Sequence, residues 1–351
     1  MGRERIIHGE STGEREEQVN WALRPRRFDE WVGQGGVIEQ LRIALDAARK
    51  RDEPLEHVLL DGPPGLGKTT LAHVIAEEMG VADRVRVTSG PAIVKQGELM
   101  STLTNLETGD VLFVDEVHRL NKVVEEFLYP AMEDFRVDFT IEGGLGGRTV
   151  NFQLKRFTLI GATTRAGMLT AAMRDRFGLR YHLDFYAPDD LMEILRRSAL
   201  RLEVTADPDS FRLIAERSRG TPRVANRLLK RIRDYAQVRA DGRIDTGVVE
   251  RALAIEQIDG KGLDQLDRAF LTALIETYHG GPAGIEALAA TMGQSRDTLE
   301  DMVEPFLLQI GFVTRTRQGR CATRKAYAHL GLTPPAEESG PGEAESSLFD
   351  E

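Results

Sequence analysis

The sequence predicts an α/β domain built on a parallel sheet, followed by a helical domain and a winged-helix domain. Short apolar runs alternate with helix-length segments between residues 55 and 185, which is typical of strands buried between two layers of helices. After residue 188 the pattern becomes helical. Near the C-terminus, three helical stretches precede a short hairpin, as in a winged helix.

Composition narrows the class of protein. The 351 residues are 41% hydrophobic and 29% charged, which suits a globular protein of two or three domains. The single cysteine, Cys321, excludes an intrachain disulfide framework and a multi-cysteine zinc site. No apolar run is long enough to span a membrane, and the N-terminus lacks the apolar region of a secretory signal. We therefore expect a cytoplasmic protein with no membrane partner.

The net charge of −10 would by itself argue against a nucleic-acid partner, but the charges are unevenly distributed along the chain. Acids accumulate at both ends of the chain, which leaves the middle close to neutral. Residues 311–325 hold five basic side chains and no acidic one. Charge placement therefore leaves nucleic-acid binding open.

Changes in pattern divide the chain. We expect a disordered arm, a large α/β domain with an inserted β-hairpin, a small helical domain, a winged-helix domain and a disordered acidic tail. In that order, the expected ranges are 1–20, 21–184 with the hairpin at about 136–155, 185–258, 259–332 and 333–351.

The elements of the large domain follow from periodicity. The predicted strands are the continuously apolar runs 57–61, 85–88, 111–115, 157–162 and 180–184. Helices over 69–79 and 123–133 lie between some of these strands. The hairpin is predicted by apolar residues that alternate with polar ones on both sides of a glycine-rich turn at 143–147.

The hairpin residues Phe139, Ile141, Leu145 and Val150 would expose apolar surface to a protein partner if the hairpin protrudes. The alternative is a hairpin folded back onto its own domain.

Beyond the large domain we expect helices over 190–202, 209–219 and 222–239 and a further one ending near residue 258. Thr221 is the expected N-cap of the third helix, with Pro222 at its first position. Residues 259–262 indicate a linker. The wing is expected at 312–323, with Gln318-Gly319 at its turn.

A phosphate-binding loop is the strongest chemical signal. Residues 62–70, GPPGLGKTT, fit G-x4-G-K-[ST] between a strand and a helix. Gly65 and Gly67 let backbone N–H groups surround a phosphate, and Lys68 should reach the β- and γ-phosphates. The hydroxyl of Thr69 should bind Mg²⁺. The alternative, a glycine-rich turn beside a solvated lysine, does not explain this context.

The strand VLFVDE, 111–116, ends in two acids. Asp115 is placed to hold Mg²⁺, and Glu116 to orient or deprotonate the attacking water. A later strand ends in Thr163 and Thr164, either of which could sense the γ-phosphate. Solvated acids and helix-capping hydroxyls are the alternatives at these positions.

Three groups of basic residues have weaker sequence signals. Arg176, in the sequence RDRF, could reach the γ-phosphate of a neighbouring subunit, and Arg223, in GTPR, could contact nucleotide from the helical domain. In the wing, Arg315 and Arg320 could neutralise DNA phosphates, and Arg296 could add a contact. Surface ion pairs or solvated faces are the alternatives.

Together these motifs resemble the AAA+ ATPases. Further segments resemble one family within them, the RuvB motors that migrate Holliday junctions in bacteria. The segments are Leu23-Arg24-Pro25, DEVHR at 115–119, YPAMED at 129–134, GATTR at 161–165 and the winged helix, within a resemblance over about 20–333.

The resemblance implies an ATP- and Mg²⁺-dependent homohexamer that moves duplex DNA at a four-way junction. RuvA would dock on the 136–155 hairpin, and the resolvase RuvC would act with both. The implied adenine contacts are Leu23, Arg24 and Tyr186. Thr70 joins the phosphate ligands, and Thr164 is the favoured sensor. The further implied ATP-site residues are Glu133, Asp134, Phe135, Arg176 and Arg223. Position 135 often holds Tyr in the family.

Two other functions fit parts of the pattern. One is a different AAA+ machine, but the chain lacks the Ser-Arg-Cys of a clamp loader and the Gly-Ala-Phe-Thr-Gly-Ala loop of a σ-dependent activator. The other is a winged-helix binder that uses ATP only as a switch. Glu116 and Arg176 argue against that reading.

Overall fold

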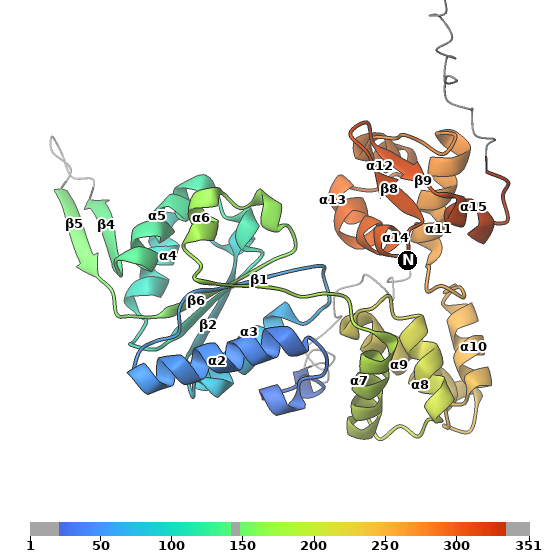
Figure 1. The fold of residues 1–351 in the computed structure, drawn as a ribbon, viewed down its shortest axis with the longest axis horizontal. Coiled ribbons are helices and arrows are strands. Elements are labelled where there is room, and N and C mark those ends of the chain that lie inside the picture. Colours follow the sequence, from blue (N-terminus) through green and yellow to red (C-terminus); the bar gives the residue numbers. More distant parts are fainter. Residues whose placement is uncertain (1–20, 142–147, 335–351) are drawn as a thin grey trace, which may run out of the picture. The chain divides into compact units, whose positions relative to one another are not determined.

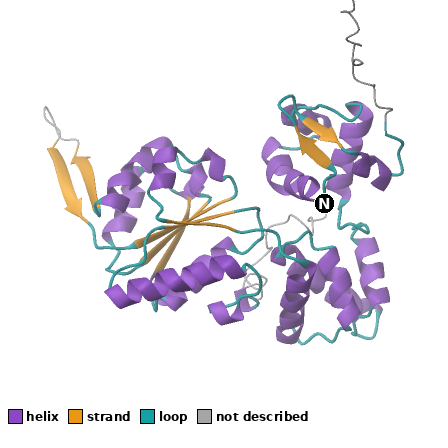
Figure 2. Cartoon of the chain, in the orientation of Figure 1, coloured by secondary structure: helices purple, strands orange, loops and turns teal. Residues whose placement is uncertain are grey.

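The computed structural model describes residues 21–141 and 148–334 (Figures 1 and 2). It contains two compact units, one that ends at Asp264 and one that begins at Gln265. The arm, the tail and the tip of the hairpin lie outside the described residues. Within the described ranges, no helix is both long and apolar enough to cross a membrane.

The first unit is built on a five-stranded parallel sheet in the order β2-β3-β6-β1-β7. Its strands are β1 (Val58–Asp61), β2 (Val85–Ser89), β3 (Val111–Asp115), β6 (Thr158–Thr163) and β7 (Leu179–His182). Every residue of β6 is buried, as is all of β3 except Asp115. The predicted parallel α/β fold is confirmed.

Successive strand residues face opposite sides of the sheet, which produces two cores. Leu60 and Phe113 pack with α2 and α3, whereas Leu59 and Leu112 pack with α4 and α5. Figure 1 shows these helices on the two faces of the sheet. These helices are α2 (Gly35–Arg51), α3 (Lys68–Glu78), α4 (Gln96–Thr104) and α5 (Lys122–Glu133). A short helix, α6 (Ala171–Asp175), precedes β7.

The predicted hairpin forms a separate antiparallel pair, β4 (Arg136–Ile141) and β5 (Arg148–Gln153), which projects beyond α5 (Figure 1). Val137, at its base, is fully buried, whereas Phe152 is 37% exposed. Val150 is half-buried. The side chains of Phe139, Ile141 and Leu145 lie outside the described residues, so their predicted exposure stays a prediction.

Four helices complete the first unit: α7 (Pro188–Arg201), α8 (Pro208–Glu216), α9 (Pro222–Arg239) and α10 (Thr246–Ile255). Thr221 occupies the N-cap position of α9, but its side chain does not cap the helix. Its hydroxyl donates instead to the carbonyl of Ser218, at 3.2 Å. Pro222 fixes the first helical φ without that cap.

The expected linker at 259–262 is packed rather than loose. Gly262 has φ +81°, and a Cβ there would lie 2.7 Å from the carbonyl oxygen of Arg217. Arg219 donates through Nε to the carbonyl of Gly262, at 3.0 Å, and Leu263 is fully buried. The segment therefore forms part of the first unit's helical region.

The second unit has the predicted helix-helix-helix-hairpin order. Its third helix runs from α13 through a π-helical turn, Leu299–Val303, into α14. A further helix, α15, follows the wing and was not predicted. The bounds are α11 (Gln265–Thr272), α12 (Ile285–Met292), α13 (Arg296–Thr298), α14 (Glu304–Gln309), β8 (Val313–Arg315), β9 (Arg320–Ala322) and α15 (Arg324–His329).

The wing turn depends on Gly319. Its φ is +147°, and a Cβ there would lie 2.4 Å from the carbonyl oxygen of Ala283. Arg320 and Ala283 exchange backbone hydrogen bonds beside it, at 2.8 and 2.9 Å. The hairpin can therefore approach the 280–284 loop only with glycine at this position.

We predict that Gly319→Ala destabilises the second unit by about 1–3 kcal/mol through backbone strain, with the steric overlap adding to it. Gly311→Ala is the matched control, because φ there is +69° but the nearest atom lies 3.7 Å away. Hydrogen exchange of the wing amides should be faster in the Gly319 variant than in the Gly311 variant. Equal exchange would contradict the role of close approach.

Candidate functional site

The loop between β1 and α3 is folded by its glycines. Gly65 and Gly67 have φ +83° and +99°, in the left-handed region that side chains avoid. Gly67 is the N-cap of α3, so the first N–H groups of this helix face the loop. This arrangement suits a bound phosphate, because N–H groups and the helix dipole both favour an anion.

Lys68 is buried beneath this loop. Its Nζ donates to the carbonyls of Gly62, at 2.7 Å, and Pro63, at 2.9 Å. Burial lowers the pKa of Lys68 to about 8, despite the opposing influence of Asp115. The ammonium group is thus held by dipoles, and a phosphate would supply the negative charge that it lacks.

The two predicted magnesium ligands meet at the carboxyl edge of the sheet. The hydroxyl of Thr69, in the first turn of α3, lies 3.3 Å from a carboxylate oxygen of Asp115, at the end of β3. Mg²⁺ prefers hydroxyl, carboxylate, phosphate and water oxygens. The chemistry of this donor pair therefore fits a magnesium ion shared with a phosphate. Thr70 follows in the same turn and is half-buried.

Glu116 is set apart from Asp115 by its backbone. Its φ of +48° places it in the left-handed region, and its N–H donates to Asp115 at 2.9 Å. Its carboxylate forms an ion pair with Arg119, with 3.0 Å between Nη1 and Oε2. Sequence reasoning missed Arg119, which is an exposed base in a family motif and gives no signal of this contact.

The two threonines at the end of β6 differ in their surroundings. Thr163 is fully buried, and its Oγ1 lies 2.9 Å from Nδ1 of His118 and accepts from the N–H of Arg165 at 3.0 Å. Thr164 is half-buried, and its hydroxyl makes no hydrogen bond to another described residue. Thr163 is thus engaged within the protein, which supports Thr164 as the sensor.

The helical region approaches the phosphate loop through Arg223 and Tyr186. The backbone N–H of Arg223 donates to the carbonyl of Gly65 at 3.3 Å, and its side chain is exposed. The buried Tyr186 donates through its hydroxyl to the carbonyl of Leu66, at 3.3 Å. Burial raises the pKa of Tyr186 far above its ordinary value, so the phenol stays protonated.

The N-terminal segment lies on the same side of the unit. Leu23 is buried, and the pKa of Arg24 is lowered first by burial and then by the charge of Arg223. A Cβ on Gly67 would lie 3.2 Å from the indole ring of Trp31. No motif marked Trp31, because its contact with the loop arises only in the folded chain.

Arg176 and Glu133 form one cluster on the sheet face opposite α3. Glu133 ends α5, and its carboxylate lies 3.0 Å from Nη2 of Arg176. The guanidinium also donates to the carbonyl of Ala172 and lies over the ring of Tyr129.

The two residues that follow Glu133 have other partners. Asp134 forms an ion pair with Arg136 at 3.2 Å. Phe135 has φ +51° and its ring contacts Phe157 edge to face.

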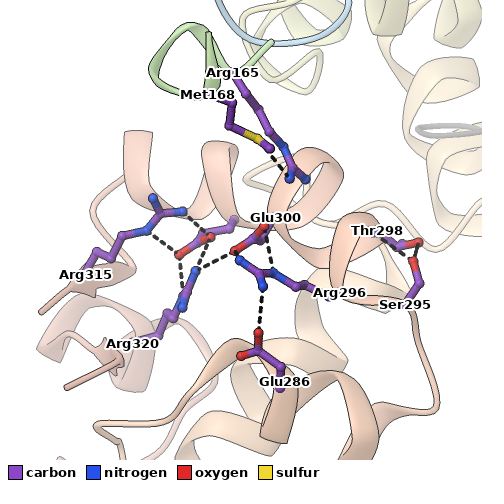
Figure 3. Close-up of polar contacts among 10 residues, drawn as sticks. Arg165, Met168, Glu286, Ser295, Arg296, Thr298, Glu300, Arg315 and Arg320 are labelled. Atoms are coloured by element: carbon purple, nitrogen blue, oxygen red, sulfur yellow. Dashed lines mark hydrogen bonds and ion pairs between the residues drawn. The ribbon is translucent and has the colours of Figure 1, made fainter. Parts of the chain in front are cut away.

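In the second unit, the three predicted DNA-binding arginines share a set of carboxylates (Figure 3). The fully buried Glu304 accepts from Arg315 at 3.0 Å and from Arg320 at 2.8 Å. Burial opposes ionisation of Glu304, but hydrogen bonds from both arginines outweigh it and hold the pKa of this carboxyl below its ordinary value.

Exposure separates these arginines. The side chain of Arg315 is 54% exposed and that of Arg320 only 12%. Arg320 also pairs with Glu300, and the exposed Arg296 pairs with Glu300 and Glu286 (Figure 3). The buried carboxylate of Glu304 was not predicted, because nothing in the sequence places this residue under the wing.

Comparison with known families covers nearly all of the described chain. Residues 23–183 match the "Holliday junction DNA helicase RuvB P-loop domain", 186–259 the "RuvB AAA lid domain" and 260–331 the "RuvB C-terminal winged helix domain".

This chain is also similar to individual proteins over almost their whole length. The Holliday junction branch migration complex subunit RuvB of Kosmotoga olearia is 54% identical over 329 residues, which cover 94% of this chain and 95% of the relative. The structure of the Thermotoga maritima RuvB branch migration motor is 50% identical with a TM-score of 0.82, over 90% of this chain and 100% of that one. A point mutant of the same motor gives a TM-score of 0.83, over 89% and 99%.

We predict that nucleotide affinity falls as pH rises above 8. The free protein loses the Lys68 proton near pH 8, whereas a bound phosphate keeps the ammonium charged, so binding takes up a proton. The dissociation constant for fluorescent ADP should increase by up to about tenfold per pH unit between pH 8.5 and 9.5. The weaker binding of Lys68→Ala should show no such slope. A flat profile for the wild-type protein would contradict the prediction.

Proposed function

Because this chain belongs to the RuvB family of AAA+ Holliday junction motors, we propose that it drives branch migration by pulling duplex DNA with the energy of ATP hydrolysis. One observation carries the proposal. Lys68, Thr69 and Asp115 are assembled at one edge of the sheet in a chain that also carries a winged helix.

The site residues divide the work of hydrolysis. The phosphate loop, with Gly65, Gly67, Lys68 and Thr70, binds the phosphates of ATP. Thr69 and Asp115 would hold Mg²⁺, which when bound neutralises charge on the β- and γ-phosphates. Glu116 orients the attacking water and accepts its proton, and Thr164 holds the water or the γ-phosphate. The ion pair of Glu116 with Arg119 must open for this role.

Residues at the nucleotide site connect the bound nucleotide to the position of the helical domain. Leu23, Arg24 and Tyr186 form the adenine side, and Arg223 contacts the phosphates from α9. Since the backbone of Arg223 already contacts Gly65, a small shift of α9 would move this guanidinium relative to the phosphate loop. Nucleotide state would thereby change the angle of the helical domain.

Hydrolysis requires a neighbouring subunit. Arg176 acts in trans on the γ-phosphate of the adjacent site, and Glu133, Asp134 and Phe135 belong to the same inter-subunit side. Such an arginine contributes about 10³–10⁵ in rate, so turnover depends on assembly. This is the arrangement expected of a homohexameric ring.

The partners follow from the family. The motor works on four-way junction DNA with RuvA and with the resolvase RuvC. We assign the RuvA contact to the β4–β5 hairpin, because this pair lies outside the main sheet and exposes Phe152. We place the protein in the cytoplasm. The family match argues against the other AAA+ machines, and measurement of turnover separates the motor from an ATP-dependent switch.

We predict ATP-dependent separation of a synthetic four-way junction by the purified protein with its cognate RuvA. Lys68→Ala should abolish separation, because the γ-phosphate loses its cation. Arg176→Ala should bind nucleotide normally but hydrolyse ATP at least 10³-fold more slowly in the assembled ring. ATP hydrolysis without strand separation would contradict branch migration while leaving the ATPase intact.

We further predict that the wing arginines differ. Arg315→Ala should lower the slope of log affinity against log salt for duplex DNA by about one unit, and it should also reduce stability because it removes one of the two guanidinium partners of the buried Glu304. Arg320→Ala should also weaken DNA binding, but it leaves Glu304 and Glu300 with one partner fewer, which costs about 1–3 kcal/mol of stability. Thermal unfolding beside the salt titration separates the two effects. Unchanged salt slopes in both variants would contradict DNA binding by the wing.

A further inference from the structure

One face of α5 carries three polar side chains at intervals of four residues: Glu125, Tyr129 and Glu133. Residues four apart are neighbours on a helix surface, so these side chains form a single row. Asn121 is the N-cap of α5, and its side-chain oxygen accepts from the N–H of Val124 at 2.9 Å. This cap defines where the helix, and with it the row, begins.

The middle residue, Tyr129, is held at its hydroxyl. This group donates to the carboxylate of Glu125 at 2.8 Å and lies 3.1 Å from Oγ1 of Thr170. Thr170 also caps α6 by accepting from the N–H of Met173 at 3.1 Å. The phenol therefore links α5 to the start of the helix that ends beside Arg176.

The ring of Tyr129 lies under the guanidinium of Arg176. The distance from Cζ of the arginine to the ring centroid is 4.2 Å, within the range of a cation–π interaction. Nη1 donates to the carbonyl of Ala172 at 2.7 Å, and Nη2 lies 3.0 Å from Glu133. The side chain is only 19% exposed, so its position is determined by these three contacts.

The contacts restrain the guanidinium in different directions. Ala172 and Glu133 hold its two terminal nitrogens in the plane of the group. Nε is buried and has no partner among the described residues, so it adds no restraint. Movement out of the plane is limited by the aromatic ring, which is the neighbour that faces the guanidinium.

We infer that Tyr129 is a positioning residue for the trans-acting Arg176, with its ring as the surface that fixes the guanidinium for the neighbouring subunit's γ-phosphate. The inference rests on the proposed role of Arg176. Electrostatic stabilisation of a transition state requires donors at the correct distance, and a displacement of about 1 Å can cost 10²-fold in rate. Tyr129 itself touches no reacting atom.

The first test compares ring and hydroxyl. Tyr129→Leu should lower kcat for ATP by about 10- to 100-fold in the DNA-bound ring, with unchanged affinity for ADP. Tyr129→Phe keeps the ring and should remain within about threefold of wild type. Glu126→Gln is the control on the same helix, since this exposed acid is 4.0 Å from Lys122 and should leave kcat unchanged. Equal losses in the Leu and Phe variants would overturn the role of the ring.

The second test asks in which subunit the defect acts. Mixed rings of Tyr129→Leu and Lys68→Ala subunits should hydrolyse ATP, because an intact phosphate loop then meets an intact Tyr129–Arg176 pair. Rings of Arg176→Ala with Lys68→Ala subunits are the reference. Rescue in the reference but not with Tyr129→Leu would overturn this inference alone. Failure in both would overturn the trans role of Arg176, and the inference with it.

A third measurement covers the case in which Tyr129→Leu does not fold. Phenylalanine analogues with one, two and three fluorine atoms at position 129 keep the shape of the ring but progressively weaken its negative face. kcat should fall stepwise along this series at constant ADP affinity. A kcat that is independent of fluorination would overturn the cation–π contribution and the inference.

Discussion

Parallel pairing of β3, β6 and β1 is the constraint on which the rest of the molecule depends. Because these strands run side by side in the same direction, their carboxyl ends lie at one edge. Asp61 of β1 is in register with Thr163 of β6, and Asp115 ends β3, which pairs with β6 on its other side. Residues that are far apart in the chain thereby form one polar site.

Buried charge is used in two ways. Lys68 is buried, and among the described residues its ammonium group has only backbone carbonyls as direct partners, so its pKa is lowered and a bound anion would stabilise its charge. Glu304 is also buried, but it has two guanidinium partners that balance its charge. The first arrangement is suited to binding a ligand. The second is suited to holding the wing and presenting Arg315 at its surface.

Arg176 is held by partners within its own subunit, as Glu304 is, and is also proposed to bind a phosphate, as Lys68 is. Its guanidinium is held by Glu133, Ala172 and Tyr129 within one subunit, yet its proposed substrate is in the next. A side chain fixed in advance loses little entropy when it meets the phosphate. The inter-subunit contact can then control the rate without rearrangement of the arginine.

Local periodicity and short motifs with fixed spacing are enough to predict the strands, the phosphate loop, the Asp115-Glu116 pair and the winged helix. Which side chains lie beside these elements depends on how the chain packs. The hydroxyl of Thr221 turns to Ser218 instead of capping α9, and the 259–262 segment packs against Arg217. Tyr129 meets Arg176, Arg119 meets Glu116, and Glu304 lies beneath Arg315 and Arg320. Long side chains of this kind reach partners on other elements or a turn away, and only the packed chain brings those partners within a hydrogen bond's length.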